Sequence, residues 1–220
     1  MAIIKAVVTA GGTSRRFGNS NKLFEDLCGK PVLKYAVDLF TEMGFEVIIP
    51  SHASFMADVE ELFKDYKNVK VTRGGLTRQQ SVYRGLQEAG GSDYVIIHDG
   101  ARPLIKKEVV EKCIEKAKEK RAAIVAVKTT DTIKTVDIDK KITGTPNRAN
   151  LINVQTPQIF EYSYILEAHE KNKDKSLTDD ACLIEEIGGE VYYVEGDYSN
   201  IKITNQIDID YAKLLLASQK

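Results

Sequence analysis

The chain has 220 residues, and its 43% hydrophobic and 29% charged content suits one large α/β domain with a polar surface. A formal net charge of −1, from 31 basic and 32 acidic residues, argues against nucleic acid and a membrane surface as partners. The three distant cysteines, Cys28, Cys113 and Cys182, predict reduced thiols. No leader and no apolar run of about 18 residues is visible, so we expect a cytoplasmic protein.

Strands and helices are expected to alternate along the chain. Apolar runs predict strands at residues 3–8, 46–49, 69–72, 94–98, 123–127 and 191–194. Helical patterns lie at residues 32–43, 55–65, 78–88, 107–121, 162–172, 179–187 and 207–217. This order predicts an α/β fold, with a mostly parallel sheet covered by helices on both faces. Ligands of such sheets bind at the carboxyl ends of the strands.

One region, residues 131–143, breaks the alternation. Its apolar residues recur with a period of two around an Asp-Lys turn, which predicts a hairpin projecting from the domain. A lone hairpin is marginally stable in water, so we expect a partner subunit to hold it. No linker is evident. We therefore expect a single domain over residues 1–220, with a dimerisation arm at about residues 131–152 inserted in it.

A glycine turn follows the first predicted strand. Gly11 and Gly12 come directly after Ala10, and glycine lets a phosphate approach backbone N–H groups closely. A structural turn is the alternative, since the segment lacks the Lys-Ser/Thr ending of a P-loop. Arg16 and Lys22 favour a polyphosphate site, because phosphoryl and nucleotidyl transfer need fixed positive charge.

Two further clusters follow predicted strands. Gly75 would let a base or ribose pack against the backbone, and Arg78 and Ser81 share one face of a first helical turn. The alternatives are a helix cap at Thr77 and a surface position for Arg78. Asp99 ends a buried strand, which suits magnesium (Mg²⁺) or ribose contact, although a turn-forming role is the alternative.

Three other positions carry interpretations. Arg102 is placed to meet a substrate anion, whereas His98 is interpreted as structural. Lys202 lies in an apolar alternation that predicts a strand, and it either reaches out to solvent or points into the site; we favour the site. Thr178, followed by two acidic residues, is a good helix N-cap.

These segments, in this order, resemble the 2-C-methyl-D-erythritol 4-phosphate cytidylyltransferases of the non-mevalonate isoprenoid pathway, from about residue 4 to residue 216. The resemblance depends on the joint occurrence of Arg16, Lys22 and the segments TRQQSVYRGL (77–86), HDGARP (98–103), TPQ (156–158), TDDA (178–181) and NIKIT (200–204). It implies a Rossmann-like three-layer nucleotidyltransferase domain and a homodimer braced by extended arms. It also implies that a polyol phosphate attacks the α-phosphorus of CTP, with Mg²⁺ bound and pyrophosphate leaving.

The resemblance also implies roles for individual residues. Those matching its catalytic positions are Arg16, Lys22, Arg148 and Lys202. Those expected at CTP are Ala10, Gly11, Gly12, Ser14, Gly75, Arg78, Ser81, Asp99 and Gly100. Those expected at the polyol phosphate are Arg102, Thr132, Arg148, Thr156 and Lys202. Asp99 is the candidate metal ligand, and Thr132 and Arg148, on or beside the arm, are expected to serve the neighbouring subunit's site.

Two departures and two alternatives accompany this resemblance. Ser14 stands where the family usually has a second glycine, and Asn21 stands where it usually has proline before Lys22. One alternative is a ribitol 5-phosphate cytidylyltransferase, which the segments HDGARP and SVYRGL disfavour. The other is an inactive nucleotide-binding regulatory protein, which Arg16, Lys22 and Lys202 disfavour. No Cys-His or Ser-His-Asp set indicates a covalent route, and a phosphate monoester is already anionic at neutral pH.

Overall fold

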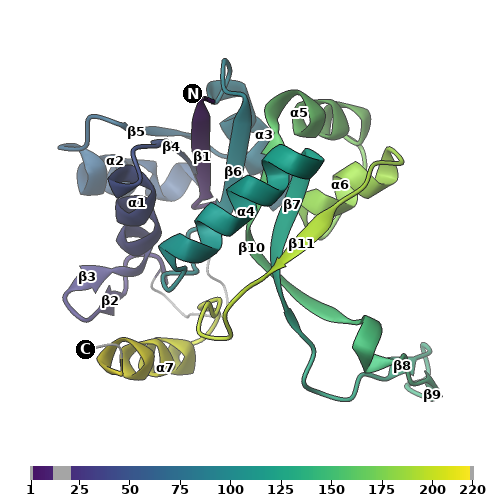
Figure 1. The fold of residues 1–220 in the computed structure, drawn as a ribbon. Helices are drawn as coiled ribbons and strands as arrows, with labels where there is room; N and C mark the ends of the chain where they lie inside the picture. The colour runs from purple at the N-terminus through teal and green to yellow at the C-terminus, as the bar shows by residue number, and fades with distance from the viewer. Residues whose placement is uncertain (1, 12–20, 219–220) are drawn as a thin grey trace.

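The chain is built on one sheet whose strand order is β11-β7-β10-β6-β1-β4-β5 (Figure 1). The structure is a computed structural model that describes residues 2–11 and 21–218. β10 runs antiparallel to both neighbours, and the other strands of the sheet share one direction. The strands are β1 (Ile4–Thr9), β4 (Glu46–Ser51), β5 (Val69–Arg73), β6 (Tyr94–Asp99), β7 (Ala122–Lys128), β10 (Ile152–Glu161) and β11 (Tyr192–Glu195).

Helices cover both faces of the sheet, as the alternation predicts (Figure 1). One core cluster packs α1, α2 and α4 against the sheet, and a second packs α3, α5 and α6 against the opposite face. The helices are α1 (Val32–Glu42), α2 (Met56–Phe63), α3 (Arg78–Glu88), α4 (Lys107–Lys120), α5 (Tyr162–Lys171), α6 (Asp180–Glu186) and α7 (Gln206–Ala217). The architecture is thus a three-layer α/β fold.

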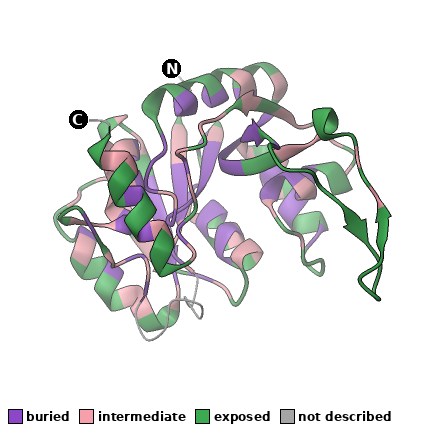
Figure 2. Ribbon diagram, turned by 90° about the horizontal axis from the view of Figure 1, so that it is seen from below, coloured by how far each residue is buried: buried purple, intermediate pink, exposed green. Residues whose placement is uncertain are grey.

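Strand β6 shows why the strands are continuous apolar runs. Ile96 belongs to one core cluster, whereas Val95 and Ile97 belong to the other. Side chains alternate across a strand, so a sheet covered on both sides buries side chains on both faces of its central strands. Figure 2 shows these buried strands between helices whose outer surfaces are exposed.

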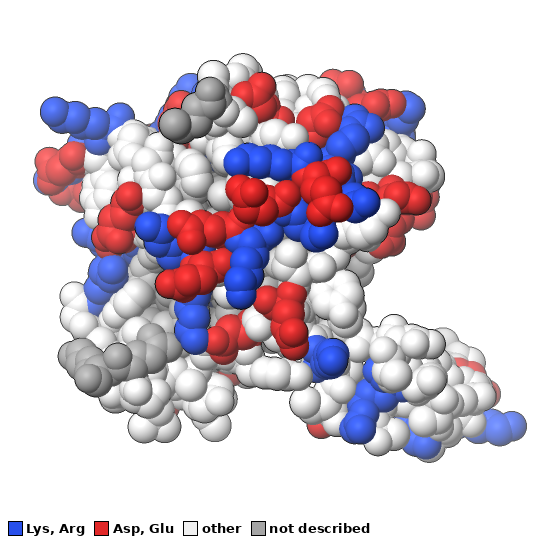
Figure 3. Space-filling model, viewed as in Figure 1, with Lys and Arg blue, Asp and Glu red and all other residues white. Residues whose placement is uncertain are grey.

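The outer surface of α4 carries interspersed charges, as its sequence predicts (Figure 3). Lys107 pairs with Glu111, and further ion pairs join lysines and glutamates three residues apart on the same helix. Water screens these exposed pairs, so they add little to the stability of the protein. The helix therefore presents a solvated face and no binding patch. In the described part of the chain, no helix is long and apolar enough to cross a membrane.

Strand β10 was not predicted from the sequence. The apolar pattern predicts no strand here, and the arm was expected to extend to about residue 152, but Ile152–Glu161 forms a strand between β6 and β7. A register shift between Val154 and Gln158 interrupts its pairing with β7. Polar residues occupy this stretch and are buried, so the apolar periodicity that marks a strand is missing there.

The expectation of a strand around Lys202 is wrong. Residues 201–204 are irregular, and the segment is fixed to the body by single contacts such as the bond from the Ile203 N–H to the carbonyl of Ala101, at 2.8 Å. The local apolar alternation reflects burial of Ile203 against α7, not pairing with a neighbouring strand.

A hairpin extends away from the domain (Figure 1). It consists of β8 (Thr135–Val136) and β9 (Ile142–Gly144), preceded and followed by irregular chain and by the short 3₁₀ helix Arg148–Asn150. The Asp137 carboxylate closes the turn by accepting the N–H groups of Asp139 and Lys141, at 3.0 and 2.9 Å. The apolar side chains of the hairpin remain exposed, and Ile138 is 97% exposed.

Candidate active site

Several glycines at the carboxyl edge of the sheet allow close packing. A Cβ on Gly11, which follows β1, would lie 2.8 Å from Ser81 Oγ. A Cβ on Gly75 would lie 2.2 Å from that of Gln80. A Cβ on Gly100 would lie 2.5 Å from Leu33 Cδ1, inside contact distance. These positions therefore require glycine for packing as well as for any approach of a ligand to the backbone.

The first turn of α3 is organised by two hydroxyl groups. Thr77 caps the helix by accepting the Gln80 N–H at 3.1 Å, as one alternative in the sequence predicted. Ser81 Oγ donates to the Thr77 carbonyl at 2.9 Å and accepts the Gly75 N–H at 3.0 Å. The glycine loop after β5 is thereby fixed against the helix that carries Arg78.

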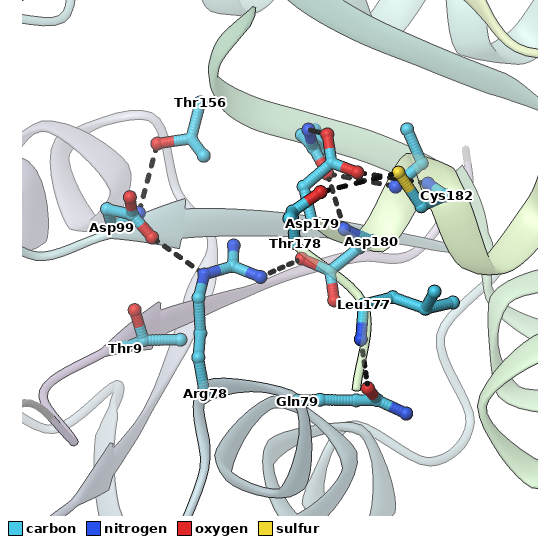
Figure 4. Close-up of polar contacts among 12 residues, drawn as sticks. Thr9, Arg78, Gln79, Asp99, Thr156, Leu177, Thr178, Asp179, Asp180 and Cys182 are labelled. Carbon is cyan, nitrogen blue, oxygen red and sulfur yellow. Dashed lines mark hydrogen bonds and ion pairs between the residues drawn. The ribbon is translucent and has the colours of Figure 1, made fainter. Parts of the chain in front are cut away.

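A chain of alternating charges crosses the carboxyl end of β6 (Figure 4). Arg78 lies between two carboxylates: its Nε donates to Asp99 Oδ1 at 3.1 Å and its Nη1 to Asp180 Oδ2 at 2.7 Å. Lys202 Nζ donates to the other oxygen of Asp99 at 2.6 Å. We refer to Asp180, Arg78, Asp99 and Lys202 as the charge ladder.

The carboxylates of the charge ladder are ionised. Burial alone would raise the pKa of Asp99, but the positive charges of Arg78 and Lys202 outweigh burial and hold this pKa well below its usual range. Asp180 behaves similarly: burial opposes ionisation, and Arg78 overcomes it, so the pKa is lowered. The two carboxylates in turn raise the pKa of Arg78 against the effect of its own burial. Each charge is therefore held by its neighbours.

Gln158 of β10 fixes the start of α6. Its Oε1 accepts the N–H groups of Asp180 and Ala181, at 3.1 and 3.2 Å, and its Nε2 donates to Asp179 Oδ2 at 2.8 Å. Asp179 caps the helix by accepting the Cys182 N–H at 3.0 Å. The N-cap is therefore Asp179 and not Thr178, which frees Asp180 to face Arg78.

Thr156 and His98 form a second line of support behind Asp99. The Asp99 N–H donates to Thr156 Oγ1 at 3.0 Å, and Thr156 Oγ1 lies 3.1 Å from His98 Nδ1. His98 Nε2 lies 3.0 Å from the Arg102 carbonyl, which can only accept. The imidazole therefore carries its proton on Nε2 and accepts the threonine O–H on Nδ1. This arrangement confirms the structural interpretation of His98.

Burial lowers the pKa of His98 to about 4, against about 6.5 in an unfolded chain. Because the folded state resists protonation, the unfolded state binds more protons between these pH values, so stability falls as pH drops from 6.5 to 4. The loss is about 3 kcal/mol at pH 4. Urea unfolding at several pH values measures this slope. His98→Gln should reduce it, and His52→Gln, a change at a less buried histidine, should keep it; an unchanged slope in His98→Gln contradicts the assignment.

Lys22 reaches the segment that carries Lys202. Its Nζ donates to the Ile203 carbonyl at 2.6 Å, across 181 residues of sequence. Asn21, one of the two departures from the resembled family, accepts the Leu23 N–H through its own Oδ1 at 3.1 Å. This side-chain turn fixes the backbone on either side of Lys22 in place of a proline ring. The structure thus places the Lys22 ammonium against the segment that carries Lys202.

A cavity of about 530 Å³ adjoins the charge ladder on the side of β10. Its apolar wall comes from β7, β10 and β11. Five of the residues that the sequence assigned to the site line it: Arg78, Asp99, Arg102, Thr156 and Lys202. Four other assigned residues lie beside β1 and β5, and we refer to them as the glycine edge: Gly11, Gly75, Ser81 and Gly100. The carboxyl end of β6 lies between these two regions.

The other assigned residues either do not line the cavity or fall outside the described part of the chain. Gly12, Ser14 and Arg16 fall outside the described residues. Thr132 and Arg148 are exposed at the base of the arm and do not line the cavity, and Arg148 Nη1 donates to the Thr130 carbonyl at 2.7 Å.

Sequence reasoning missed the roles of Gln158, Asp180 and Asn200. Asn200 donates to the Gln155 side chain at 3.1 Å and to the Thr156 carbonyl at 2.9 Å, and is fully buried. The signal that was available is their membership of the short polar segments TPQ, TDDA and NIKIT. Buried polar residues are nearly always hydrogen-bonded, but these segments carry no local signal of burial or of the partner.

Asp99 suits a Mg²⁺ ion as a single ligand. Each of its oxygens accepts one hydrogen bond and keeps a lone pair, and the carboxylate is ionised. Among the described residues, no group of three or more His, Cys, Asp or Glu side chains could hold a metal ion by itself. Mg²⁺ is commonly held by one or two carboxylates together with substrate phosphates, so this set fits that mode.

The three-layer α/β fold, with cations gathered around one aspartate at the strand ends, is that of a nucleotidyltransferase, as its structural neighbours show. The family model described as "IspD: 2-C-methyl-D-erythritol 4-phosphate cytidylyltransferase" matches residues 3–218. The chain therefore belongs to this family, whose members act in the non-mevalonate isoprenoid pathway.

Curated relatives and solved structures agree with this assignment. A 2-C-methyl-D-erythritol 4-phosphate cytidylyltransferase of Clostridium botulinum is 40% identical over 97% of this chain and 99% of the relative. That of Caldanaerobacter subterraneus is 41% identical over 97% of this chain and 98% of its own. The structure of 4-diphosphocytidyl-2C-methyl-D-erythritol synthase from Anaerococcus prevotii matches with a TM-score of 0.88, at 32% identity, over 98% of this chain and 99% of that one.

Proposed function

We propose that this chain performs cytidylyl transfer by aligning two phosphate groups between fixed cations, without a covalent enzyme intermediate. The reaction is that of its family: CTP and 2-C-methyl-D-erythritol 4-phosphate give 4-CDP-2-C-methyl-D-erythritol and pyrophosphate. The observation that carries the mechanism is the charge ladder, in which Arg78 and Lys202 share Asp99 at the carboxyl end of β6.

In this mechanism CTP lies over the glycine edge, and the polyol phosphate lies against Arg102, Thr156 and Lys202. The phosphate monoester is already a nucleophile at neutral pH, so no protein group has to remove a proton from it. Arg102 suits an anion, because its buried Nε has no hydrogen-bond partner among the described residues. Lys22, Lys202 and Arg16 would stabilise the charge that develops on the α-phosphate and on leaving pyrophosphate.

We further propose that Asp99 is the protein ligand of Mg²⁺. When bound, the ion would neutralise charge on the triphosphate oxygens. The chain's own contribution is to keep Asp99 ionised and correctly oriented. Arg78 and Lys202 hold its two oxygens, and Thr156 accepts its backbone N–H.

A pyrophosphate-release assay tests the function. The protein is incubated with CTP and Mg²⁺, and with either 2-C-methyl-D-erythritol 4-phosphate or ribitol 5-phosphate, in parallel with samples containing a chelator. We expect release with the methylerythritol phosphate, and loss of release in the chelator. Faster turnover of ribitol 5-phosphate overturns the substrate assignment. Binding of CTP without pyrophosphate release in the presence of either acceptor supports the regulatory alternative.

We also propose that the chain forms a homodimer through the arm, and that Arg148 of each subunit serves the partner's site. Exposed Val136, Ile138 and Ile142 on the hairpin support this proposal, because a lone hairpin with uncovered apolar side chains is unstable in water. Arg148 itself is exposed beside the arm and away from the cavity of its own subunit.

A cytoplasmic location stays a prediction.

Arg148→Ala should raise the KM for the polyol phosphate at least about tenfold and change the KM for CTP by less than about threefold. Equal losses for both substrates contradict the role. Mixing Arg148→Ala with Lys22→Ala subunits, after unfolding and refolding together, tests action between subunits. If Arg148 acts on the partner's site, each mixed dimer contains one intact site, and turnover with the wild-type KM for the polyol phosphate appears. If it acts within its own subunit, every site keeps one defect, and no turnover with the wild-type KM appears.

A further inference from the structure

His169 is a buried titratable side chain that the mechanism above does not use. It lies in the last turn of α5 and is 1% exposed. Its ring stacks on that of Tyr83 of α3, with centroids 6.0 Å apart and an interplanar angle of 24°. Its Nε2 faces Asp180 of α6, 3.3 Å from Oδ1. The imidazole therefore lies where three helices meet, directly behind the charge ladder.

Two buried polar atoms face each other at this point. Neither His169 Nε2 nor Asp180 Oδ1 has a hydrogen-bond partner of good geometry among the described residues. The other oxygen of Asp180, Oδ2, holds Arg78 Nη1. A buried carboxylate needs donors on both oxygens, and the imidazole is the group placed to supply the second one.

We propose that His169 is a positioning residue for cytidylyl transfer, because its imidazole orients Asp180, which in turn orients Arg78 toward the nucleotide. This inference rests on the proposed function and on the contact of Arg78 with CTP that the family resemblance implies. The imidazole acts through Asp180 and does not touch substrate. Without its donor, the Asp180 carboxylate can rotate to seek another partner, and Arg78 then loses one of its two anchors.

The neighbouring contacts limit how else Asp180 can be held. Gln158 binds the backbone N–H of Asp180 and not its carboxylate. Gln79 joins α3 to the chain before α6, through the Asn172 carbonyl at 2.9 Å and the Leu177 N–H at 3.3 Å. These bonds set the positions of the helices, whereas the rotation of the Asp180 side chain depends on Arg78 and His169.

Steady-state kinetics on His169→Leu and His169→Gln test the proposal. Leucine fills the space without a donor, whereas the glutamine amide nitrogen can occupy the position of Nε2. We expect His169→Leu to raise the KM for CTP about tenfold with kcat within about threefold of wild type, and His169→Gln to restore the KM to within about threefold. Ile165→Val, a change in the core on the same helix, should leave both constants unchanged.

A double-mutant cycle separates positioning from packing. In an Asp180→Asn background, adding His169→Leu should change the KM for CTP by less than about twofold, because the group through which the imidazole acts is already altered. A wild-type KM in His169→Leu, or the same tenfold increase in both backgrounds, overturns the proposal. If His169→Leu does not fold, His169→Gln is compared with His169→Asn, whose shorter side chain cannot reach the Nε2 position. Equal KM values for these two variants overturn the proposal.

Arg78→Lys distinguishes failure of this inference from failure of the proposed CTP contact. If Arg78→Lys leaves the KM for CTP unchanged, the role of Arg78 is wrong, and the inference about His169 fails with it. If Arg78→Lys raises the KM and His169→Leu does not, only the role of His169 is wrong.

Discussion

We expect Lys22→Ala to lower kcat by about 10²–10³-fold, which corresponds to about 3–4 kcal/mol of transition-state stabilisation. The Lys22 ammonium contacts the carbonyl of Ile203. Ile203 directly follows Lys202, whose own ammonium contacts Asp99. A charge fixed in this way costs little reorganisation when negative charge develops on the triphosphate. The effect should appear mainly in kcat, because the interaction strengthens in the transition state.

Single-turnover measurements with saturating CTP and methylerythritol phosphate test this expectation, since they separate chemistry from product release. Lys107→Ala, which removes an exposed lysine on α4, is the matched control and should leave kcat unchanged. A fall of tenfold or less in Lys22→Ala would show that this lysine is peripheral to catalysis. Circular dichroism of both variants checks that the fold is retained.

The second large effect is expected for Asp99→Asn, which keeps the shape of the side chain and removes its charge. The amide keeps one oxygen and replaces the other by a donor, so Arg78 or Lys202 loses its acceptor at this position, and neither keeps an anionic partner there. We expect kcat/KM for CTP to fall by about 10²–10³-fold, because the cations lose the anion that positions them and the proposed Mg²⁺ site loses its carboxylate. Removing one partner of a buried ion pair also destabilises the fold, here by about 3 kcal/mol.

Asp93→Asn is the matched control, because Asp93 precedes the same strand, β6, at its opposite end, and its carboxylate accepts the exposed Ile3 N–H at 2.7 Å. Activity should be unchanged in this variant. Chemical denaturation gives the stability of both proteins, and initial rates at several CTP concentrations give kcat/KM. Full activity in Asp99→Asn would remove Asp99 from the site and leave the charge ladder as a structural feature only.

Much of the fold was predictable because each element leaves a local record in the sequence. Residues 78–88 were predicted as a helix and form α3 with those bounds, since a capping threonine and a 3.6-residue apolar period lie within one short window. The hairpin was predictable for the same reason, from a period of two around one turn. Strand β10 was not predicted, because buried polar residues such as Gln158 interrupt the apolar pattern within it.

The sequence by itself determined which residue types the site uses: glycines after β1 and β5, an aspartate at the end of β6, and cations in several separate segments. Only the tertiary structure decided which charges meet. Arg78 and Asp180 are 102 residues apart, and Asp99 and Lys202 are 103 apart. Local periodicity records which side of an element is buried, whereas a pairing over such a span depends on how the whole sheet brings its strand ends together.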